Sequence, residues 1–254
     1  IMTTDTIPKW SERTVDDPRQ NFQVVGIAKG AAMIAPNMAT MLAVILTDMP
    51  LDQEVADMLL REAVEESFNC ITVDGHMSTN DTVFMLANGA SGHPMITMPS
   101  GADYKSFVKA LEFICTDLAK KIARDGEGAT KLVEIQVNGA RSDEDARTIG
   151  MSVANSALVK TAIYGHDPNW GRIICAVGYA DADSDPDTID LFLCGHQLTK
   201  DGQGLPLDEP MMRKALEVNE ISVVIDLKMD EGKARIWTCD MSHEYVTINA
   251  EYTT

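Results

Sequence analysis

A continuous apolar run, MLAVIL from Met41 to Leu46, constrains the fold of this chain more than any other feature. A segment of small residues precedes it and Pro50 follows soon after, so the run is too short for a long helix and suits a strand. Successive side chains of a strand point to opposite faces, so this run places apolar side chains on both. It therefore predicts a central strand, with Thr40 at its entrance.

The rest of the chain alternates between helical and strand-like patterns. Apolar residues at helical spacing predict helices over 51–68, 102–126 and 142–165, and a shorter one near 211–218. Strand-like runs lie at 22–28, 71–73, 130–139, 173–180, 188–195, 221–229 and 233–241, whereas 82–89 fits a strand or a short buried helix. The polar segment 10–23 is predicted to be a surface loop. Long helices among strands, without a linker-like break in composition, predict a compact layered α/β protein.

Charge and cysteine usage narrow the class of protein. Asp and Glu outnumber Lys and Arg by 39 to 21, which disfavours nucleic acid or an anionic membrane as a partner and mildly favours a cationic small molecule. No apolar stretch approaches the ~20 residues of a membrane span, and the opening IMTTDT lacks the features of a signal peptide. The five cysteines are scattered, without CxxC spacing, which predicts reduced, buried thiols in a cytoplasmic protein.

Thr40 is the candidate for chemistry. A threonine hydroxyl is a weak nucleophile that needs a base, but the five histidines are dispersed and no GxSxG, HExxH, P-loop or GxGxxG motif is present. If the peptide bond before Thr40 is cut, its freed α-amine, with a pKa of about 8, can take the proton from the hydroxyl of the same residue. The alternative is that Thr40 is simply a β-branched residue that begins a strand.

Several motifs together resemble one family. The segments GIAKGAAMIAPNMATML, DGHMSTNDTVFMLANGASG, LVKTAIYGHDPNWGR and NAEYTT occur in the order expected for the ArgJ family, the ornithine acetyltransferases (glutamate N-acetyltransferases) of arginine biosynthesis. The resemblance covers residues 1–254. It implies an ArgJ/DmpA-like layered α-β-β-α sandwich with mixed sheets, and a precursor that cleaves itself between Ala39 and Thr40. Residues 1–39 would be the C-terminal tail of the α chain, and residues 40–254 the β chain.

The resemblance also implies roles for single residues. Thr40 would be the catalytic nucleophile, and the substrate would be bound by Thr3, Lys29, Thr40, Glu127, Asn249 and Thr254. A cation at Lys29 can bind the substrate carboxylate and keep a nearby amine neutral, unless it is an ordinary solvated lysine. Glu127, between two glycines, can pair with the ammonium group of ornithine, unless it is a surface acid in a turn.

Other positions are less sharply assigned. Thr4 can replace Thr3 in the alignment, and Asn80, Asp81, Trp170 and Arg172 are expected to be mainly structural. The oxyanion donors of the family, a threonine–glycine pair, belong to a part of the α chain that this sequence does not contain.

The resemblance predicts a ping-pong acetyltransferase without metal or organic cofactor. Thr40 would take the acetyl group from N-acetylornithine and pass it to glutamate, and acetyl-CoA is a second donor in some members. The expected assembly is an (αβ)2 heterotetramer that includes the rest of the α chain. The alternatives are a DmpA-type N-terminal-nucleophile aminopeptidase, in which water resolves the acyl-enzyme, and an unprocessed relative without catalysis.

Overall fold

The computed structural model describes residues 1–16, 20–35, 41–78 and 80–251. The chain divides into two compact units. Unit 1 contains Ile1–Ile71 and His76–Asp125, and unit 2 contains Thr72–Gly75 and Gly126–Thr254. None of the helices in the described part of the chain has the length and apolar character needed to cross a bilayer.

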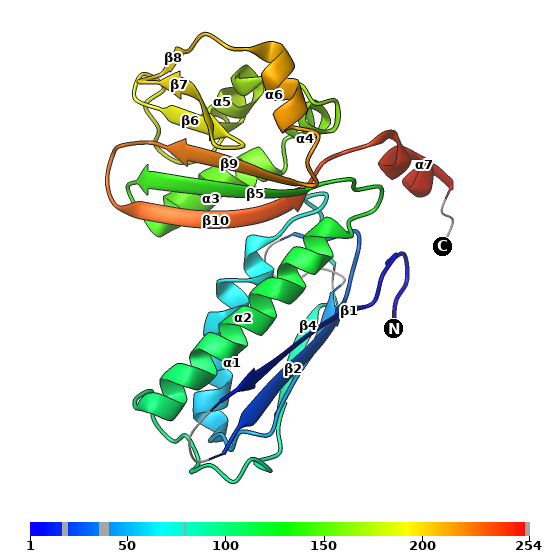
Figure 1. Ribbon diagram of the computed structural model, residues 1–254, viewed down its shortest axis with the longest axis vertical. Coiled ribbons are helices and arrows are strands. Elements are labelled where there is room, and N and C mark those ends of the chain that lie inside the picture. Colours follow the sequence, from blue (N-terminus) through cyan, green and yellow to red (C-terminus); the bar gives the residue numbers. More distant parts are fainter. Residues whose placement is uncertain (17–19, 36–40, 79, 252–254) are drawn as a thin grey trace. The chain divides into compact units, whose positions relative to one another are not determined.

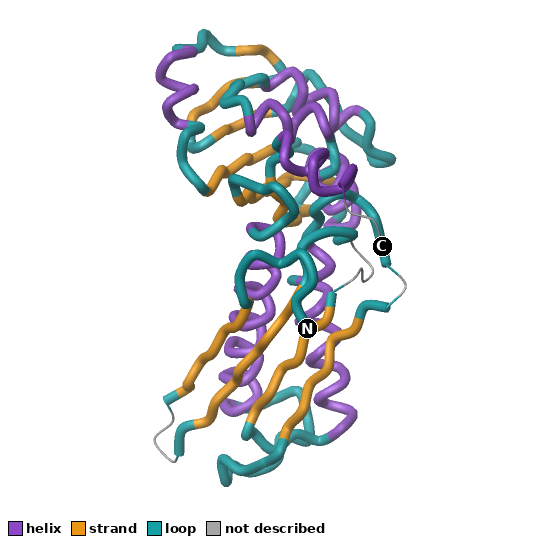
Figure 2. The backbone as a smooth tube through the Cα atoms, turned by 90° about the vertical axis from the view of Figure 1, so that its right-hand side faces the viewer, coloured by secondary structure: helices purple, strands orange, loops and turns teal. Residues whose placement is uncertain are grey.

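Unit 1 is a four-stranded sheet with helices on one face (Figure 1). Its elements are β1 (Lys9–Val15), β2 (Phe22–Lys29), β3 (Leu42–Thr47), α1 (Gln53–Glu65), the 3-10 turn η1 (Phe68–Cys70), β4 (Thr82–Ala87) and α2 (Ala102–Arg124). The strand order is β1-β2-β3-β4, with β1, β2 and β3 antiparallel in turn and β3 parallel to β4. Figure 2 shows the four strands in front with the helices behind them, so the helices cover a single face of the sheet.

The inner face of this sheet carries the core of unit 1. The predicted apolar stripe of α2 is fully buried: Phe107, Leu111, Ile114, Leu118 and Ile122. Gly26 in β2 allows the close approach of α2, because a Cβ there would lie 2.6 Å from side-chain atoms of Ile114 and Leu118. The apolar side chains on the inner face of β3, Ala43 and Ile45, are buried in this core.

Unit 2 is a six-stranded mixed sheet with a helical layer. Its strands are β5 (Leu132–Ala140), β6 (Asp190–Leu193), β7 (His196–Lys200), β8 (Gln203–Gly204), β9 (Glu220–Asp226) and β10 (Gly232–Cys239), in the order β10-β5-β9-β6-β7-β8. Its helices are α3 (Asp143–Ala154), α4 (Ala157–Tyr164), α5 (Trp170–Gly178), α6 (Glu209–Ala215) and α7 (His243–Glu251). Among these described strands, only β5 and β9 pair in parallel. Helix α3 packs on β5 and β10, and Ser142 accepts from the Asp145 amide (3.1 Å) as its predicted N-cap.

The α/β class with mixed sheets is confirmed, and four local predictions are wrong. The strand-like run 71–73 belongs to none of the named strands. The segment 10–23, predicted to be a surface loop, contains most of β1. β1 is an edge strand with many polar side chains, so its sequence resembles that of a loop. The segment 173–180 lies largely in α5, because Ile173, Ala176 and Val177 recur at helical spacing and are buried together. The predicted helix over 142–165 is two helices, because Ser156 caps a second one by accepting from the Val159 amide.

The prediction of buried cysteines holds for three of the five. Cys70, Cys115 and Cys239 are buried, whereas Cys194 is half-buried and Cys175 is exposed on α5. Burial raises the pKa of Cys115 to about 12, which keeps its thiol protonated and unreactive.

Candidate active site

The first strand positions of β3 lie beside the end of β2. In register, Lys29 pairs with Leu42, and Leu42 pairs with Thr82, the first residue of β4. The Thr82 amide also donates to the Met41 carbonyl oxygen (3.1 Å), which extends this arrangement to the residue next to Thr40. Ala39 and Thr40 themselves lie outside the described residues, so the predicted cleavage site is located only by its bonded neighbour, Met41.

Lys29 is not an ordinary solvated lysine. The residue is only 6% exposed, although its side chain carries a charge at the end of a strand. Its positive charge acts on Asp81, the residue before β4. A buried cation beside the entrance of β3 is suited to holding an anionic group.

Asp81 connects the entrances of β3 and β4. Its Oδ1 accepts a hydrogen bond from the Met41 amide at 2.5 Å. Its Oδ2 is buried, and among the described residues no donor meets it. Burial raises the pKa of Asp81, although the Met41 amide and the charge of Lys29 act in the opposite direction.

The N-terminal segment is fastened to the same end of the sheet by Asp5. The Thr3 amide donates to Asp5 Oδ2 (3.2 Å), and Asp5 Oδ1 accepts from the Gly30 amide (2.7 Å) and from Lys9 Nζ (2.6 Å). Lys9 Nζ also contacts Asp125 Oδ2 at 2.5 Å, and the Lys9 side chain has no solvent exposure. Burial works against ionisation of Asp5, but the donors from Gly30, Lys9 and Thr3 prevail and lower its pKa. Asp5 thus links exposed Thr3 to the residue after Lys29.

In unit 2, Glu127 is held by α7. Glu127 is 8% exposed as a residue, and its Oε2 accepts from Asn249 Nδ2 at 2.8 Å. The next residue, Gly128, has φ +68°, and a Cβ there would lie 2.5 Å from the Tyr245 amide nitrogen. The turn therefore needs glycine in order to pack against α7. Glu127 is consequently a buried, positioned acid rather than a surface acid.

Two further side chains fasten the turn that carries Glu127. Asp240 Oδ1 accepts from the Thr130 amide (2.7 Å) and the Lys131 amide (2.9 Å), while Ser242 Oγ donates to the Gly128 carbonyl (2.5 Å). Asp240 is itself buried. These contacts give the turn a defined conformation without α7.

A family model described as "ArgJ family" matches residues 1–254. The chain belongs to the ArgJ family.

Named relatives agree with this assignment. The "Arginine biosynthesis bifunctional protein ArgJ" of Geobacter sulfurreducens is 49% identical over all of this chain and 65% of its own length. The "Glutamate N-acetyltransferase" of Methanocaldococcus jannaschii is 48% identical over all of this chain and 64% of its own length. The chain thus spans slightly less than two thirds of these relatives. The 2.00 Å crystal structure of the Bacillus halodurans "Arginine biosynthesis bifunctional protein argJ" matches with a TM-score of 0.80 and 40% identity, covering 82% of this chain and 98% of the solved one.

The residues expected from the ArgJ resemblance fall into two described groups. In unit 1, Lys29 lies beside the start of β3, and Thr3 is tied to Gly30 through Asp5. In unit 2, Glu127 and Asn249 are in direct contact. Thr254, like Thr40, lies outside the described residues.

The structure also adds residues that the sequence reasoning did not select. Asp5, Lys9 and Asp240 hold the segments that carry Thr3, Lys29 and Glu127. Among the described residues, no group of three or more His, Cys, Asp or Glu side chains is arranged to hold a metal ion. Arg172 anchors α5 by donating to the Leu158 carbonyl at 2.9 Å, which is the structural role expected of it.

Proposed function

We propose that this chain carries the C-terminal tail of the α chain, residues 1–39, and the β chain, residues 40–254, of an acetyltransferase of arginine biosynthesis. The enzyme moves the acetyl group of N-acetylornithine to glutamate. The observation that carries the proposal is the match of the ArgJ family over the whole chain, with relatives named for arginine biosynthesis and glutamate N-acetylation. Acetyl-CoA as a second donor, the cytoplasm as the location and independence of cofactors belong to the same proposal.

The chemistry begins with cleavage between Ala39 and Thr40. Thr40 Oγ then attacks the acetyl carbonyl carbon while the freed α-amine takes the hydroxyl proton. Collapse of the tetrahedral intermediate breaks the C–N bond, and the ammonium group returns the proton to the departing ornithine nitrogen. The amine of glutamate attacks the resulting acetyl ester, which yields N-acetylglutamate and free Thr40.

The described side chains support the assigned binding roles. Lys29 is a buried cation suited to the substrate carboxylate, and Glu127 is a buried carboxylate suited to the ammonium group of ornithine. Asn249 orients Glu127 through their hydrogen bond. Thr3 and Thr254 complete the proposed set on the strength of the family resemblance.

The length of the solved relative supports a chain that begins at Thr40. The matched part, 82% of 254 residues, is about 208 residues, and because it makes up 98% of the solved chain that chain is about 212 residues long. The proposed β chain, residues 40–254, is of nearly the same length.

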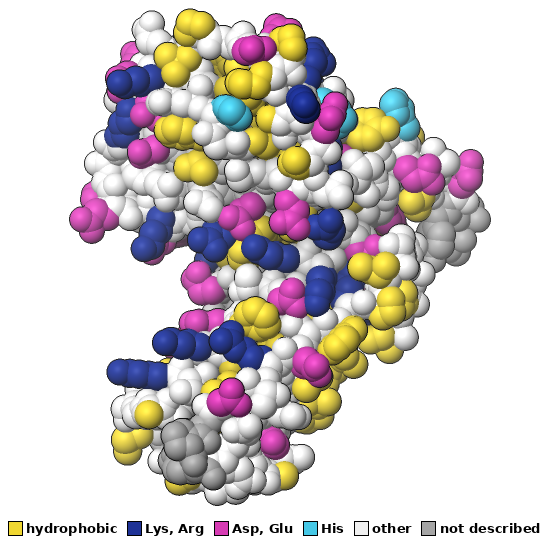
Figure 3. All heavy atoms as spheres, viewed as in Figure 1, with side chains coloured by type: hydrophobic (Ala, Val, Ile, Leu, Met, Phe, Trp, Pro, Cys, Tyr) yellow, Lys and Arg dark blue, Asp and Glu magenta, His cyan; other side chains and the backbone are white. Residues whose placement is uncertain are grey.

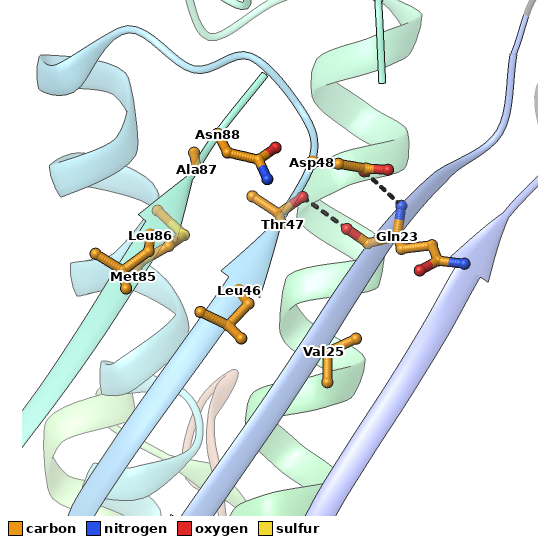
Figure 4. Close-up of a pocket in the computed structure, with 9 residues that line it drawn as sticks. All are labelled: Gln23, Val25, Leu46, Thr47, Asp48, Met85, Leu86, Ala87 and Asn88. Carbon is orange, nitrogen blue, oxygen red and sulfur yellow. Dashed lines mark hydrogen bonds between the residues drawn. The ribbon is translucent and has the colours of Figure 1, made fainter. Parts of the chain in front are cut away.

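The sheet of unit 1 supports the rest of the α chain as a partner. On the face away from the helices, Trp10, Ile27, Val44 and Phe84 form one row across β1 to β4. Val25, Leu46 and Leu86 form a second row across β2 to β4, which continues to Glu12 on β1. Trp10 is 55% exposed, Phe84 57% and Leu86 59%. Hydrophobic side chains are correspondingly exposed along the strands of this unit (Figure 3), and the second row lines an open depression of about 440 Å³ (Figure 4).

An apolar surface of this kind is what a covered sheet face has before its covering layer is added. About a third of each relative's own length lies outside the match, which is enough for such a layer. We therefore assign this face to the remaining α chain, within an (αβ)2 heterotetramer.

Mass spectrometry of the full-length protein tests the proposal. We expect a second chain that begins at Thr40 and gains about 42 Da on exposure to N-acetylornithine. Thr40→Ala should show neither cleavage nor acetylation. A protein that stays uncut while fully active would exclude the mechanism, and loss of N-acetylornithine at a rate independent of glutamate would indicate the hydrolase instead.

A further inference from the structure

Lys160 on α4 is a buried cation that the proposed chemistry does not use. The residue is only 2% exposed, whereas lysines seldom lose contact with water unless their ammonium group is paired. Its Nζ donates to the Cys239 carbonyl oxygen at 2.6 Å and to Thr238 Oγ1 at 2.8 Å, and it lies 3.6 Å from Cys239 Sγ. These acceptors all lie at the end of β10, so the ammonium group fastens that strand end to α4.

The contact between Lys160 and Cys239 is not a reactive ion pair. Burial raises the pKa of the Cys239 thiol, and the positive charge of Lys160 only partly offsets this effect. The thiol therefore stays protonated and is a poor nucleophile at neutral pH. Cys239 is also the last residue of β10, where its pairing with β5 stops at Leu132. Lys160 supplies a donor to a carbonyl group at the point where this ladder ends.

The segment held by Lys160 continues into the residues that fasten the Glu127 turn. The Met241 amide donates to the Lys160 carbonyl oxygen at 3.3 Å, so the backbone of Lys160 holds the same segment as its side chain. Between these contacts, Asp240 accepts from the amides of residues 130 and 131, and just beyond them Ser242 donates to the carbonyl oxygen of residue 128. The turn that carries Glu127 is therefore built against a segment whose position Lys160 sets.

Two further contacts connect this segment to Glu127 itself. A Cβ at Gly126, the residue before Glu127, would lie 2.9 Å from Cys239 Sγ, so the thiol packs closely against the start of the turn. Ser242 Oγ also accepts from an amide in the first turn of α7 at 3.1 Å, and α7 is the helix whose Asn249 donates to Glu127. The segment thus supports both the backbone around Glu127 and the side chain that orients its carboxylate.

We propose that Lys160 is a positioning residue for Glu127. Its ammonium group and its carbonyl oxygen fix residues 238–241 against α4, and this segment in turn fixes the Glu127 carboxylate where it meets the ammonium group of the substrate. The inference rests on the proposed function, because that function assigns substrate binding to Glu127. Lys160 acts through Glu127 and not on the reacting atoms, so its loss should weaken substrate binding and leave the chemical step intact.

Lys160→Met in the full-length protein tests this role, because methionine keeps a long unbranched side chain but cannot donate to the carbonyl and hydroxyl oxygens. We expect KM for N-acetylornithine to rise about tenfold with kcat nearly unchanged, since a displaced Glu127 binds the ground state and the transition state less well to the same extent. Steady-state kinetics with glutamate in excess measure both constants.

A double variant separates action through Glu127 from a general loss of order. Glu127→Gln removes the negative charge that binds the substrate ammonium group, and should itself raise KM. If Lys160 acts through Glu127, adding Lys160→Met to this variant should change KM by less than about twofold, because the interaction that Lys160 supports is already lost. Independent effects would instead multiply the two single losses.

Two other variants control for stability. Thr199→Val on β7 removes another fully buried donor to a main-chain carbonyl, that of Ile189 (3.0 Å), and three strands separate β7 from β10 in the sheet. It should lower the unfolding temperature without changing KM. Thr238→Val removes only one acceptor of the ammonium group. If Lys160→Met does not fold, this milder variant takes its place, with an expected rise in KM of about threefold.

The outcomes distinguish this inference from the proposed function. If the wild type transfers acetyl groups from N-acetylornithine to glutamate but the folded Lys160 and Thr238 variants keep its KM, the inference is overturned and the proposed function stands. A lower kcat at unchanged KM, or full multiplication of the losses in the double variant, would overturn it as well. If the wild type transfers no acetyl group, the proposed function fails and this inference falls with it.

Discussion

The two sheets of this molecule are built alike on their inner faces and differ on their outer ones. Each has a helical layer over one face, α1 and α2 in unit 1 and α3 in unit 2. The opposite face of unit 1 is largely apolar, with one row that begins at Trp10 and a second that joins Glu12 to Val25, Leu46 and Leu86. The corresponding face of β5 carries Glu134, Gln136 and Asn138, and Gln136 Nε2 donates to Glu134 Oε1 at 2.8 Å.

The outer faces of the two sheets thus differ in how much apolar surface they expose to water. A polar outer face can remain in water, as is common for sheets with an antiparallel component, whereas an apolar one gains by being covered. In unit 2, Trp237 and Val224 lie beside Glu134 and Gln136 on the same face, so that face is mixed in character. The outer face of unit 1 exposes more apolar side chains, among them Trp10, Phe84 and Leu86.

The largest expected effect tests the apolar face directly. The double variant Phe84→Asp, Leu46→Asp should prevent assembly with the remaining α chain, because each substitution places a charge in an interface that buries apolar side chains. Size-exclusion chromatography of the full-length protein measures this, and we expect aggregated or unassembled material. Gln136→Asp on the outer face of unit 2 is the control and should assemble normally. Equal assembly of both proteins would contradict the assignment of the face.

A smaller effect tests the similarity of the inner faces. Leu118→Ala in α2 and Ile149→Ala in α3 each remove a fully buried side chain and should each cost about 2–5 kcal/mol of unfolding free energy. Urea unfolding followed by circular dichroism measures both. A cost below about 1 kcal/mol for either variant would show that one helical layer is packed more loosely than the structure indicates.

The smallest effect concerns the hydrogen bonds and the ion pair that Asp5 forms in unit 1. The pKa of Asp5 is lowered by folding, so Asp5 contributes stability above its unfolded pKa, near 3.9, and loses it as the pH falls through its lower folded value. Asp5→Asn should lower stability at neutral pH by about 1–3 kcal/mol and flatten the loss of stability in acid. Thermal unfolding from pH 7 to pH 2 tests this. An acid profile identical to that of the wild type would show that Asp5 carries no such contribution.

The sequence revealed those elements whose pattern is local. The five-residue stripe of α2 and the apolar run of β3 each express a single period, and both elements formed where predicted. β1 was not predicted, because its inward side chains include the polar residues Lys9 and Ser11. The strand therefore lacks the alternation of polar and apolar residues that indicates a strand with one buried face. α5 was predicted as a strand, because the run IICAV fits a strand as well as a short helix. The joint burial of Ile173 and Val177, four residues apart, identifies the helix.

The site was predictable only as far as the family motif extends. Lys29, Glu127 and Asn249 could be assigned by resemblance, and the structure then showed that two of them are in contact. Asp5 was not selected, and Asp81 was expected only to be structural, because their partners Gly30 and Met41 lie 25 and 40 positions away in the sequence. No local pattern of residues records such a pairing.

The ladder between β2 and β3 has a consequence for the proposed scission. Six positions of β2, from Val24 to Lys29, pair with β3 on the other side of the Ala39–Thr40 bond. Cleavage of that bond would therefore create a new chain end, but the fragment that contains β2 would stay bound, because its backbone remains hydrogen-bonded to β3 in the sheet. Such a product would migrate as two bands under denaturing conditions and elute as a single species under native conditions. The peptide bond would be permanently broken, but the fold would be almost unchanged.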